Sequence, residues 1–209
     1  MITLHRSGDT SAGFRALLGV EEIRLAPDEE IPLHTHVDVE IITYVLEGSV
    51  GHQDALNNGT IIFPGDIHRA TAGRGISHTE FNNSESEAAR YLQISITPES
   101  LGMIPGYEQR MFIEEEAAGR WLLIASRDGR GDTVTIHQDA GLYAAVIEAG
   151  EGIDIDLDAG RAGWLRVLRG AIRLNGELLA DGDVAEIIDA PGLHLIAADR
   201  AELLLFDLA

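Results

Sequence analysis

Three histidines and one glutamate occur in this chain at a spacing that suits metal binding. His34 and His36 are separated by one residue, and His78 and Glu80 repeat that spacing. Residues two apart in a β-strand point to the same face. Each pair would therefore present two ligand-capable side chains on one side of a strand. If the two strands lie near each other, three imidazoles and one carboxylate meet, and the sequence predicts a metal site.

The chemistry of such a site follows from its donor atoms. Neutral imidazoles suit iron, copper, nickel and zinc, and an added carboxylate leaves positions open for substrate or dioxygen. One His-x-His pair on a strand could equally be a polar face. The second pair and the glycine-rich segment at 71–76 before it favour the metal interpretation. The chain has no cysteine, so any metal must be held by nitrogen and oxygen.

Composition excludes several classes of function. The net charge is −20, and all 15 basic residues are arginine. Such a surface repels phosphate backbones and anionic membranes, so neither nucleic acid nor membrane is an expected partner. Solubility explains the acidity. No apolar run is long enough for a transmembrane helix. The first nine residues lack a basic region followed by an apolar block, so we expect a cytoplasmic protein.

Short β-prone segments must position these ligands. A strand is expected at 20–26, and further segments rich in β-branched and aromatic residues alternate with turn clusters. Many short strands at regular spacing predict an all-β fold of antiparallel strands. The segment 12–19 is expected to form a turn of helix or a docked arm. The other expected strands are 41–46, 48–52, 60–63, 67–71, 76–81 and 90–97.

A weak internal repeat suggests two copies of one β unit. Residues 45–50 resemble 167–172, and 64–67 resemble 181–184, on either side of a Pro- and Gly-containing connection at 97–107. Counting back from Gly170 as from Gly48 places Asp156 and Asp158 where His34 and His36 stand, with His194 near the place of His78. These three form either a remnant oxygen-rich site or, as we expect, solvated carboxylates with a separate histidine.

The first half of the chain resembles the pirin family of bicupins, whose bacterial members include quercetin 2,3-dioxygenase-like proteins. The second half resembles their second cupin more loosely, through Trp164 to Gly170 and the closing segment 203–208. Two features depart from the family pattern, namely a shorter arm before Val20 and a basic set at 68–70. The segments that carry the main resemblance are His34-Thr35-His36, Glu40 to Gly48, His52-Gln53-Asp54, Pro64-Gly65-Asp66, Thr71 to Ile76, His78 and Glu80.

The resemblance implies two antiparallel β-sandwich (jelly-roll) cupin domains. We expect an N-terminal cupin with the metal site in residues 1–100, and a linker and second cupin without metal in residues 101–209. The resemblance implies one Fe(II) ion, with nickel, copper, cobalt, manganese or zinc as alternatives. Its four ligand positions correspond to His34, His36, His78 and Glu80.

The activity implied by the resemblance is dioxygen-dependent cleavage of a flavonol-like, enol or catechol substrate, with carbon monoxide released by the resembled enzymes. Glu80 would ligate the metal or accept the proton of the substrate hydroxyl. An alternative is a non-catalytic, iron-dependent redox sensor that binds a protein partner. An isomerase or epimerase would suit cupins in general. A monomer is expected.

The remaining polar residues have less specific interpretations. Glu40 is either solvated or orients a ligand imidazole. His52 and His68 are expected on strand surfaces, although His68 could reach the mouth of a pocket. Arg74 would pair a carboxylate or cap its turn. His5 and His137 have no companion in the sequence, and they are expected to be structural.

Overall fold

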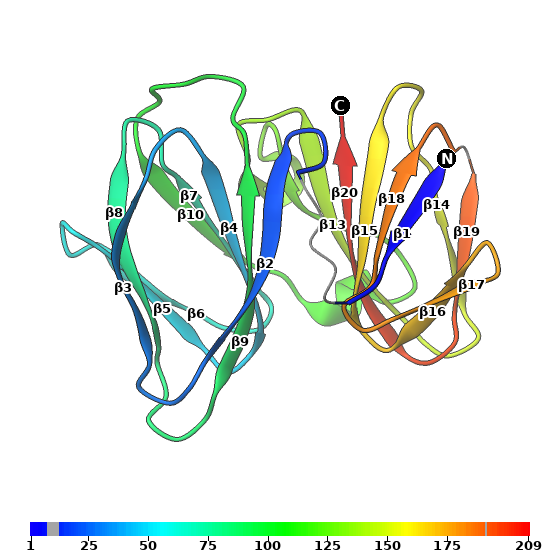
Figure 1. The fold of residues 1–209 in the computed structure, drawn as a ribbon, viewed down its shortest axis with the longest axis horizontal. Coiled ribbons are helices and arrows are strands. Elements are labelled where there is room, and N and C mark those ends of the chain that lie inside the picture. The colour runs from blue at the N-terminus through cyan, green and yellow to red at the C-terminus, as the bar shows by residue number, and fades with distance from the viewer. Residues whose placement is uncertain (8–12, 191) are drawn as a thin grey trace. The chain divides into compact units, whose positions relative to one another are not determined.

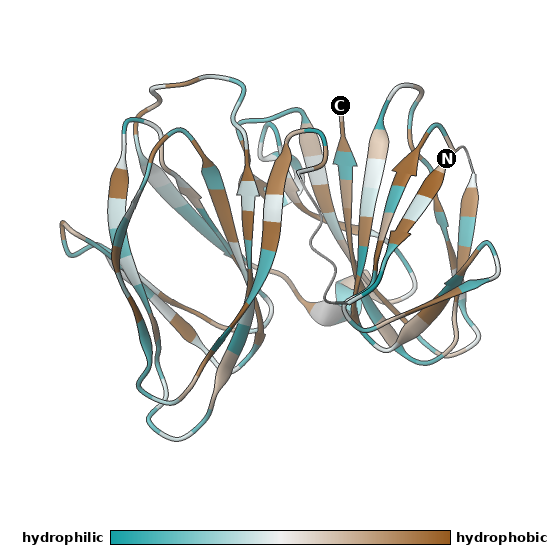
Figure 2. Cartoon of the chain, in the orientation of Figure 1, coloured by the Kyte–Doolittle hydropathy of each residue, from teal (hydrophilic) through white to brown (hydrophobic). Residues whose placement is uncertain are grey.

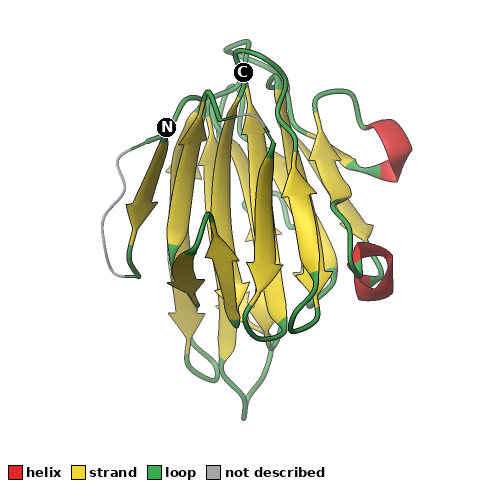
Figure 3. Ribbon diagram, turned by 90° about the vertical axis from the view of Figure 1, so that its right-hand side faces the viewer, coloured by secondary structure: helices red, strands yellow, loops and turns green. Residues whose placement is uncertain are grey.

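The computed structural model describes residues 1–7, 13–190 and 192–209. Strands account for nearly all of its regular structure, with two short 3-10 helices, η1 (Glu114–Ala117) and η2 (Arg130–Asp132) (Figure 3). None of the helices in this described part is long and apolar enough to span a membrane. The strands are β1 (Ile2–His5), β2 (Leu17–Leu25), β3 (Glu30–His36), β4 (Glu40–Glu47), β5 (Val50–Asp54), β6 (Gly59–Ile62), β7 (Asp66–Thr71), β8 (Ile76–Asn82), β9 (Ala89–Ile96), β10 (Gly106–Met111), β11 (Leu122–Ser126), β12 (Val134–Thr135), β13 (Ala140–Ile147), β14 (Gly152–Ile155), β15 (Ala162–Arg169), β16 (Ala171–Leu174), β17 (Glu177–Ala180), β18 (Val184–Ile188), β19 (Leu193–Ala197) and β20 (Ala201–Leu208).

The chain divides into two compact units. The first unit contains residues 16–112 and 127–138, and the second contains residues 1–15, 113–126 and 139–209. The first unit has one sheet in the order β10-β7-β4-β9-β2 and another in the order β3-β8-β5-β6 (Figure 1). The predicted all-β fold of antiparallel β-sandwiches is confirmed. The division of the domains at residue 100 stays a prediction.

Both units are built on one topology, which confirms the internal repeat. The order β7-β4-β9-β2 of the first unit recurs as β18-β15-β20-β13 in the second, and β3-β8-β5-β6 recurs as β14-β19-β16-β17. Eight successive strands, β2 to β9, thus correspond one to one with β13 to β20. The correspondence identifies β14 and β19 as the counterparts of β3 and β8, the strands that carry the predicted ligands.

The repeated glycines have a common conformational role. Gly48 follows β4 with φ at 71°, and Gly170 follows β15 with φ at 78°. Only glycine adopts such angles without strain. A Cβ atom at these positions would collide with the backbone oxygen of Ala88 or of Arg200, respectively. Both positions therefore require glycine to let the chain pass close to the neighbouring strand.

The strand boundaries agree with the sequence to within a few residues, with one larger difference near the N-terminus. Strand β2 begins at Leu17 rather than Val20, because the buried Leu17 already pairs with Ile96 of β9. Of the segment expected to be helical or a docked arm, Ala12 lies outside the described residues. The remainder forms a turn and the start of β2.

The interiors of the two units differ in polarity. Apolar and polar residues alternate along the strands of both units (Figure 2). The second unit contains a continuous aliphatic cluster that includes Ile153, Ile155, Leu193 and Leu195. In the first unit the strands β5, β7 and β8 carry buried polar side chains, among them three histidines that are at most 3% exposed. A buried polar group is costly unless it has a partner, so these side chains mark the functional site.

Candidate metal centre

Strands β3 and β8 bring the predicted histidines together. His34 and His78 are directly opposite each other in the antiparallel register. The register of β3 shifts between Ile31 and His34, and from His34 on the side chains alternate, so that both His34 and His36 are partly buried. In β8 every second residue is buried, which places His78 and Glu80 on the same inward face. Strand alternation thus groups the three histidines as expected.

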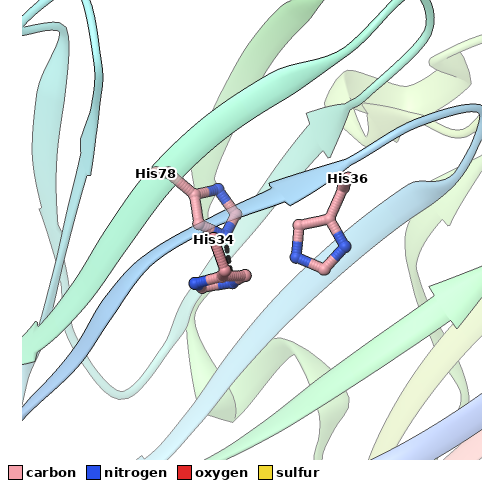
Figure 4. A group of neighbouring side chains, drawn as sticks. All are labelled: His34, His36 and His78. Atoms are coloured by element: carbon pink, nitrogen blue, oxygen red, sulfur yellow. Dashed lines mark hydrogen bonds between the residues drawn. The ribbon is translucent and has the colours of Figure 1, made fainter.

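The three imidazoles converge on one another (Figure 4). Ligand-capable ring atoms of His34, His36 and His78 all lie within 4.8 Å of one another. The Nε2 atoms of His34 and His78 are 2.9 Å apart. Two nitrogen ligands about 2.1 Å from one ion, at right angles, are separated by about 3 Å. The spacing of these two rings therefore fits a shared ion.

The hydrogen bonds of the rings also fit metal binding. Nδ1 of His34 donates to the backbone carbonyl of Pro32 over 2.9 Å, because a carbonyl oxygen can only accept. A neutral imidazole carries one N–H, so Nε2 of His34 keeps its lone pair. Nε2 of His36 is buried and has no hydrogen-bond partner. A metal ion would satisfy this orphaned nitrogen, which supports the prediction of a nitrogen-rich site.

Glu80 lies on the same face but is held by different partners. Its side chain is 1% exposed, and its Oε2 accepts hydrogen bonds from the Tyr91 hydroxyl at 2.8 Å and the Gln93 amide at 3.0 Å. The carboxylate is not part of the group of ring atoms within 4.8 Å. Burial raises the pKa of Glu80, and the bond from Tyr91, the nearby His34 and the bond from Gln93 lower it in part. The role of Glu80 as a fourth ligand stays a prediction.

His52 and His68 are not strand-surface residues, contrary to the expectation from sequence. They are 3% and 2% exposed, respectively. Nε2 of His52 lies 2.7 Å from Nδ1 of His78, and the rings of His52 and His68 are 4.9 Å apart. The burial of His52 could have been predicted from the sequence. Val50, His52 and Asp54 share one face of β5, and the apolar Val50 identifies that face as buried.

Burial controls the protonation of this histidine cluster. It lowers the pKa of His52 to about 4, and that of His68 and His78 to about 3, and the charges of neighbouring histidines lower all three further, although Asp54 partly opposes the effect at His52. The pKa of His36 is also lowered, first by burial and then by His34. Neutral rings near pH 7 retain the lone pairs that bind metals.

Glu40 is neither solvated nor beside the ligands. It is fully buried, and its Oε2 accepts a hydrogen bond from Thr71 at 3.0 Å and lies 3.3 Å from Nδ1 of His137 and 3.9 Å from Nε of Arg69. His68, next to Arg69, faces the other side of β7. Burial raises the pKa of Glu40, while His137 and Arg69 lower it. These residues form a polar cluster of their own, and the structural role of His137 stays a prediction.

Two further expectations concern Arg74 and His5. Nε of Arg74 donates to the backbone carbonyl of Gly102 at 3.1 Å, so it holds a loop rather than a carboxylate. His5 lies 3.2 Å from Glu186, which pairs the ring with a carboxylate within the second unit. Neither residue belongs to the histidine cluster.

In the second unit the counterparts of the ligand strands have a different composition. Strands β14 and β19 pair Ile153 with Leu195 and Ile155 with Leu193, and all four are buried in the aliphatic cluster. Asp156 and Asp158 lie in the loop after β14, not at the positions of His34 and His36. His194 is exposed and pairs with Asp154 at 2.7 Å. Asp156 and Asp158 are exposed, so the expected solvated carboxylates, and not the alternative of a remnant site with His194, agree with the structure.

Comparisons with known proteins agree with this architecture. A family model described as Pirin matches residues 7–96, and one described as Quercetinase C-terminal cupin domain matches residues 123–208. A quercetin 2,3-dioxygenase of Escherichia coli (strain K12) is 36% identical over 196 residues, which cover 94% of this chain and 84% of that protein. The chain belongs to the pirin family. A pirin-like protein of Caulobacter vibrioides is 37% identical over 186 residues, covering 88% of this chain and 80% of that protein.

Solved structures of the pirin family match the whole chain. A crystal structure of the bacterial pirin YhhW from Escherichia coli in complex with nickel(II) has a TM-score of 0.92 at 31% identity, and the match covers 100% of this chain and 99% of that chain. A salicylate 1,2-dioxygenase from Pseudaminobacter salicylatoxidans has a TM-score of 0.58 at 13% identity, covering 90% and 70%, which shows a similar fold only. The predicted pirin-family bicupin is confirmed.

Proposed function

We propose that this pirin-family chain is a metal-dependent dioxygenase that cleaves flavonol-like, enol or catechol substrates with dioxygen. The observation that carries the proposal is the convergence of His34, His36 and His78 within 4.8 Å. The names of the relatives support it, since one at 36% identity is a quercetin 2,3-dioxygenase and the matching pirin structure contains nickel(II). In this proposal Glu80 completes the ligand set.

The expected ion is Fe(II), with nickel, copper, cobalt, manganese or zinc as alternatives. Three imidazoles and one carboxylate suit all of these to different degrees, so the ligand set does not select among them. When bound, the ion supplies Lewis acidity, which lowers the pKa of a coordinated substrate hydroxyl, and open positions for substrate and dioxygen. The remaining chemistry falls to the side chains.

Glu80 is the proposed catalytic base. Both Tyr91 and Gln93 donate to its Oε2, which leaves Oε1 to bind the ion or to take the proton of the substrate hydroxyl. Burial raises the pKa of Glu80 and so makes it a stronger base than a solvated carboxylate. These two donors hold the carboxylate in one orientation.

The proposed partners are a small aromatic molecule and dioxygen. A chain with net charge −20 and no lysine does not attract nucleic acid, because its surface repels phosphates. We expect the protein to act as a monomer in the cytoplasm.

Two measurements on one sample test the proposal. Elemental analysis of the purified protein gives the metal content, and oxygen uptake with quercetin follows after anaerobic loading with Fe(II). We expect about one metal per chain and turnover that releases carbon monoxide. A Glu80→Gln variant serves as the matched control, since it keeps the size of the side chain and one oxygen that can accept from Tyr91 and Gln93, but it cannot act as a base.

Other outcomes would redirect the assignment. One metal per chain without turnover on flavonols and catechols would overturn the oxygenase and favour a metal-dependent sensor, whose association with a protein partner would change with the oxidation state of iron. A protein that binds no metal after loading would contradict the whole site.

A further inference from the structure

Two buried histidines with no assigned role, His52 and His68, continue a row of rings that begins at the predicted ligands. The row starts at His34 and continues through His78 and His52 to His68. The Nε2 atoms of His34 and His78 are 2.9 Å apart, Nδ1 of His78 is 2.7 Å from Nε2 of His52, and the ring centroids of His52 and His68 are 4.9 Å apart. These rings come from four different strands, β3, β8, β5 and β7.

A neutral imidazole carries one hydrogen, so the hydrogen bonds between these rings determine which nitrogen of each ring is free to bind a metal. His34 uses its hydrogen on Nδ1 toward Pro32, so its Nε2 is a lone pair. If the hydrogen of His78 is on Nε2, the ring donates to His34 and cannot bind a metal through that atom. If the hydrogen is on Nδ1, His78 donates to His52, and both Nε2 lone pairs point into the same space. The partner of Nδ1 therefore decides whether His78 can be a ligand.

We infer that His52 is a positioning residue, whose Nε2 accepts the Nδ1 hydrogen of His78 and so holds that ring in the tautomer and orientation that bind a metal. The inference rests on the metal site proposed above, and not on the oxygenase reaction. A metal-bound histidine usually donates its other N–H to a carbonyl or a carboxylate. Here the acceptor is a third imidazole, buried with the ligand.

The surroundings of His52 suit an acceptor. His52 is 3% exposed, and its Nε2 lies 2.7 Å from Nδ1 of His78, which is hydrogen-bond distance for a ring nitrogen that accepts through its lone pair. The Tyr107 ring of β10 contacts His52 edge-on at 5.3 Å and stacks on His68 at 6.0 Å. The Tyr107 hydroxyl donates to Asp54 at 3.1 Å, which fixes the aromatic ring. Tyr107 and His68 thus restrict the rotation of His52.

The decisive measurement needs no variant. In protein loaded with diamagnetic Zn(II), the long-range ¹H–¹⁵N spectrum of the histidine rings reports which nitrogen of His78 carries hydrogen. We expect hydrogen on Nδ1 of His78 and a scalar coupling across the bond to Nε2 of His52. Hydrogen on Nε2 of His78 would overturn the inference, as would a wild-type protein that binds no zinc.

Variants provide an independent test through nickel affinity, measured by competition with a chelator at fixed pH. His52→Leu removes the acceptor, and we expect affinity to fall by about 10- to 100-fold. His52→Gln offers an amide oxygen in its place and should recover most of that loss. His137→Gln is the matched control, because His137 contacts Glu40 outside the ligand cluster, and it should bind nickel as the wild type does.

The outcomes separate this inference from the proposed function. Equal nickel affinity in wild type and in a folded His52→Leu variant would contradict the positioning role, whatever the activity. Normal nickel binding without oxygen uptake would contradict the dioxygenase and leave the role of His52 intact. Equal losses in the Leu and Gln variants would show that His52 acts through packing alone, which also overturns the inference.

Discussion

His34 and His78 face each other across strands β3 and β8, with their Nε2 atoms 2.9 Å apart. Neither residue is near the other in sequence, and each is followed two residues later by another predicted ligand. Cross-strand pairing thus turns two local patterns into one site. Because the site lies on two strands of one sheet, its geometry is set by the register of that sheet and not by a mobile loop.

The first prediction concerns the ligands. His34→Ala should reduce metal affinity by more than about 100-fold, since removing a ligand costs more than the 10- to 100-fold typical of an outer-sphere partner. The fold should persist, because His34 is only partly buried and lies outside the aliphatic clusters. Elemental analysis and thermal unfolding of the same sample measure both. Stoichiometric metal in a His34→Ala, His36→Ala double variant would contradict the assignment of these histidines as ligands.

The second prediction concerns the proton acceptor. The hydrogen bond from the Tyr91 hydroxyl lowers the pKa of Glu80, so its loss in Tyr91→Phe should raise that pKa. A base must be deprotonated to act. The acidic limb of the pH profile of oxygen uptake should therefore move to higher pH in Tyr91→Phe. An unchanged limb, with metal content equal to that of the wild type, would mean that Glu80 is not the base.

The third prediction concerns stability in acid. Burial lowers the pKa of His68 from 6.5 to about 3 in the folded protein. Between these values the unfolded chain binds a proton that the folded chain does not, so the free energy of unfolding falls as pH decreases below 6.5. His68 should contribute about 1.4 kcal/mol per pH unit to this slope. In His68→Gln the contribution disappears, because glutamine does not titrate.

Urea unfolding of the metal-free protein at pH 7, 6 and 5 measures that difference. Wild type and His68→Gln should diverge steadily as the pH falls, with the variant losing less stability. The dependence of the free energy on urea concentration should be the same in both, which verifies that the same surface unfolds. Parallel pH slopes for the two proteins would show that His68 does not remain neutral in the fold.

Much of this site could be predicted from sequence because the alternation of side chains along a strand is a local property. Alternation along a strand places His78 and Glu80 on one face wherever the strand lies. The glycine at position 48 and its copy at 170 likewise predicted the repeat. What alternation does not supply is the register between strands. In the pairing of β5 with β8, Asp54 is opposite His78 and His52 is opposite Glu80. The contact between His52 and His78 is therefore a diagonal one across the two strands, and it depends on this register.

The error in the second unit has a specific cause. Counting residues back from Gly170 assumes that both copies have connections of equal length. Strand β3 ends at His36 and β4 begins at Glu40, whereas β14 ends at Ile155 and β15 begins only at Ala162. The longer connection moves Asp156 and Asp158 out of the strand. The apolar residues Ile153 and Ile155 identify the inward-facing positions of this strand better than counting does. Inward-facing positions are kept between the two copies even when the connections differ in length.

The last prediction compares glycines with the same backbone conformation but different surroundings. Gly170 and Gly176 have φ at 78° and 86°, so alanine would be strained at both, by about 1 kcal/mol. At Gly170 the added methyl group would also collide with the Arg200 backbone, while at Gly176 nothing lies within 4 Å. Gly170→Ala should therefore lower the free energy of unfolding by about 1–3 kcal/mol more than Gly176→Ala, which is the usual cost of overpacking. Urea unfolding of the two variants measures the difference, and equal losses would mean that the close approach of the chain at Gly170 does not constrain this residue.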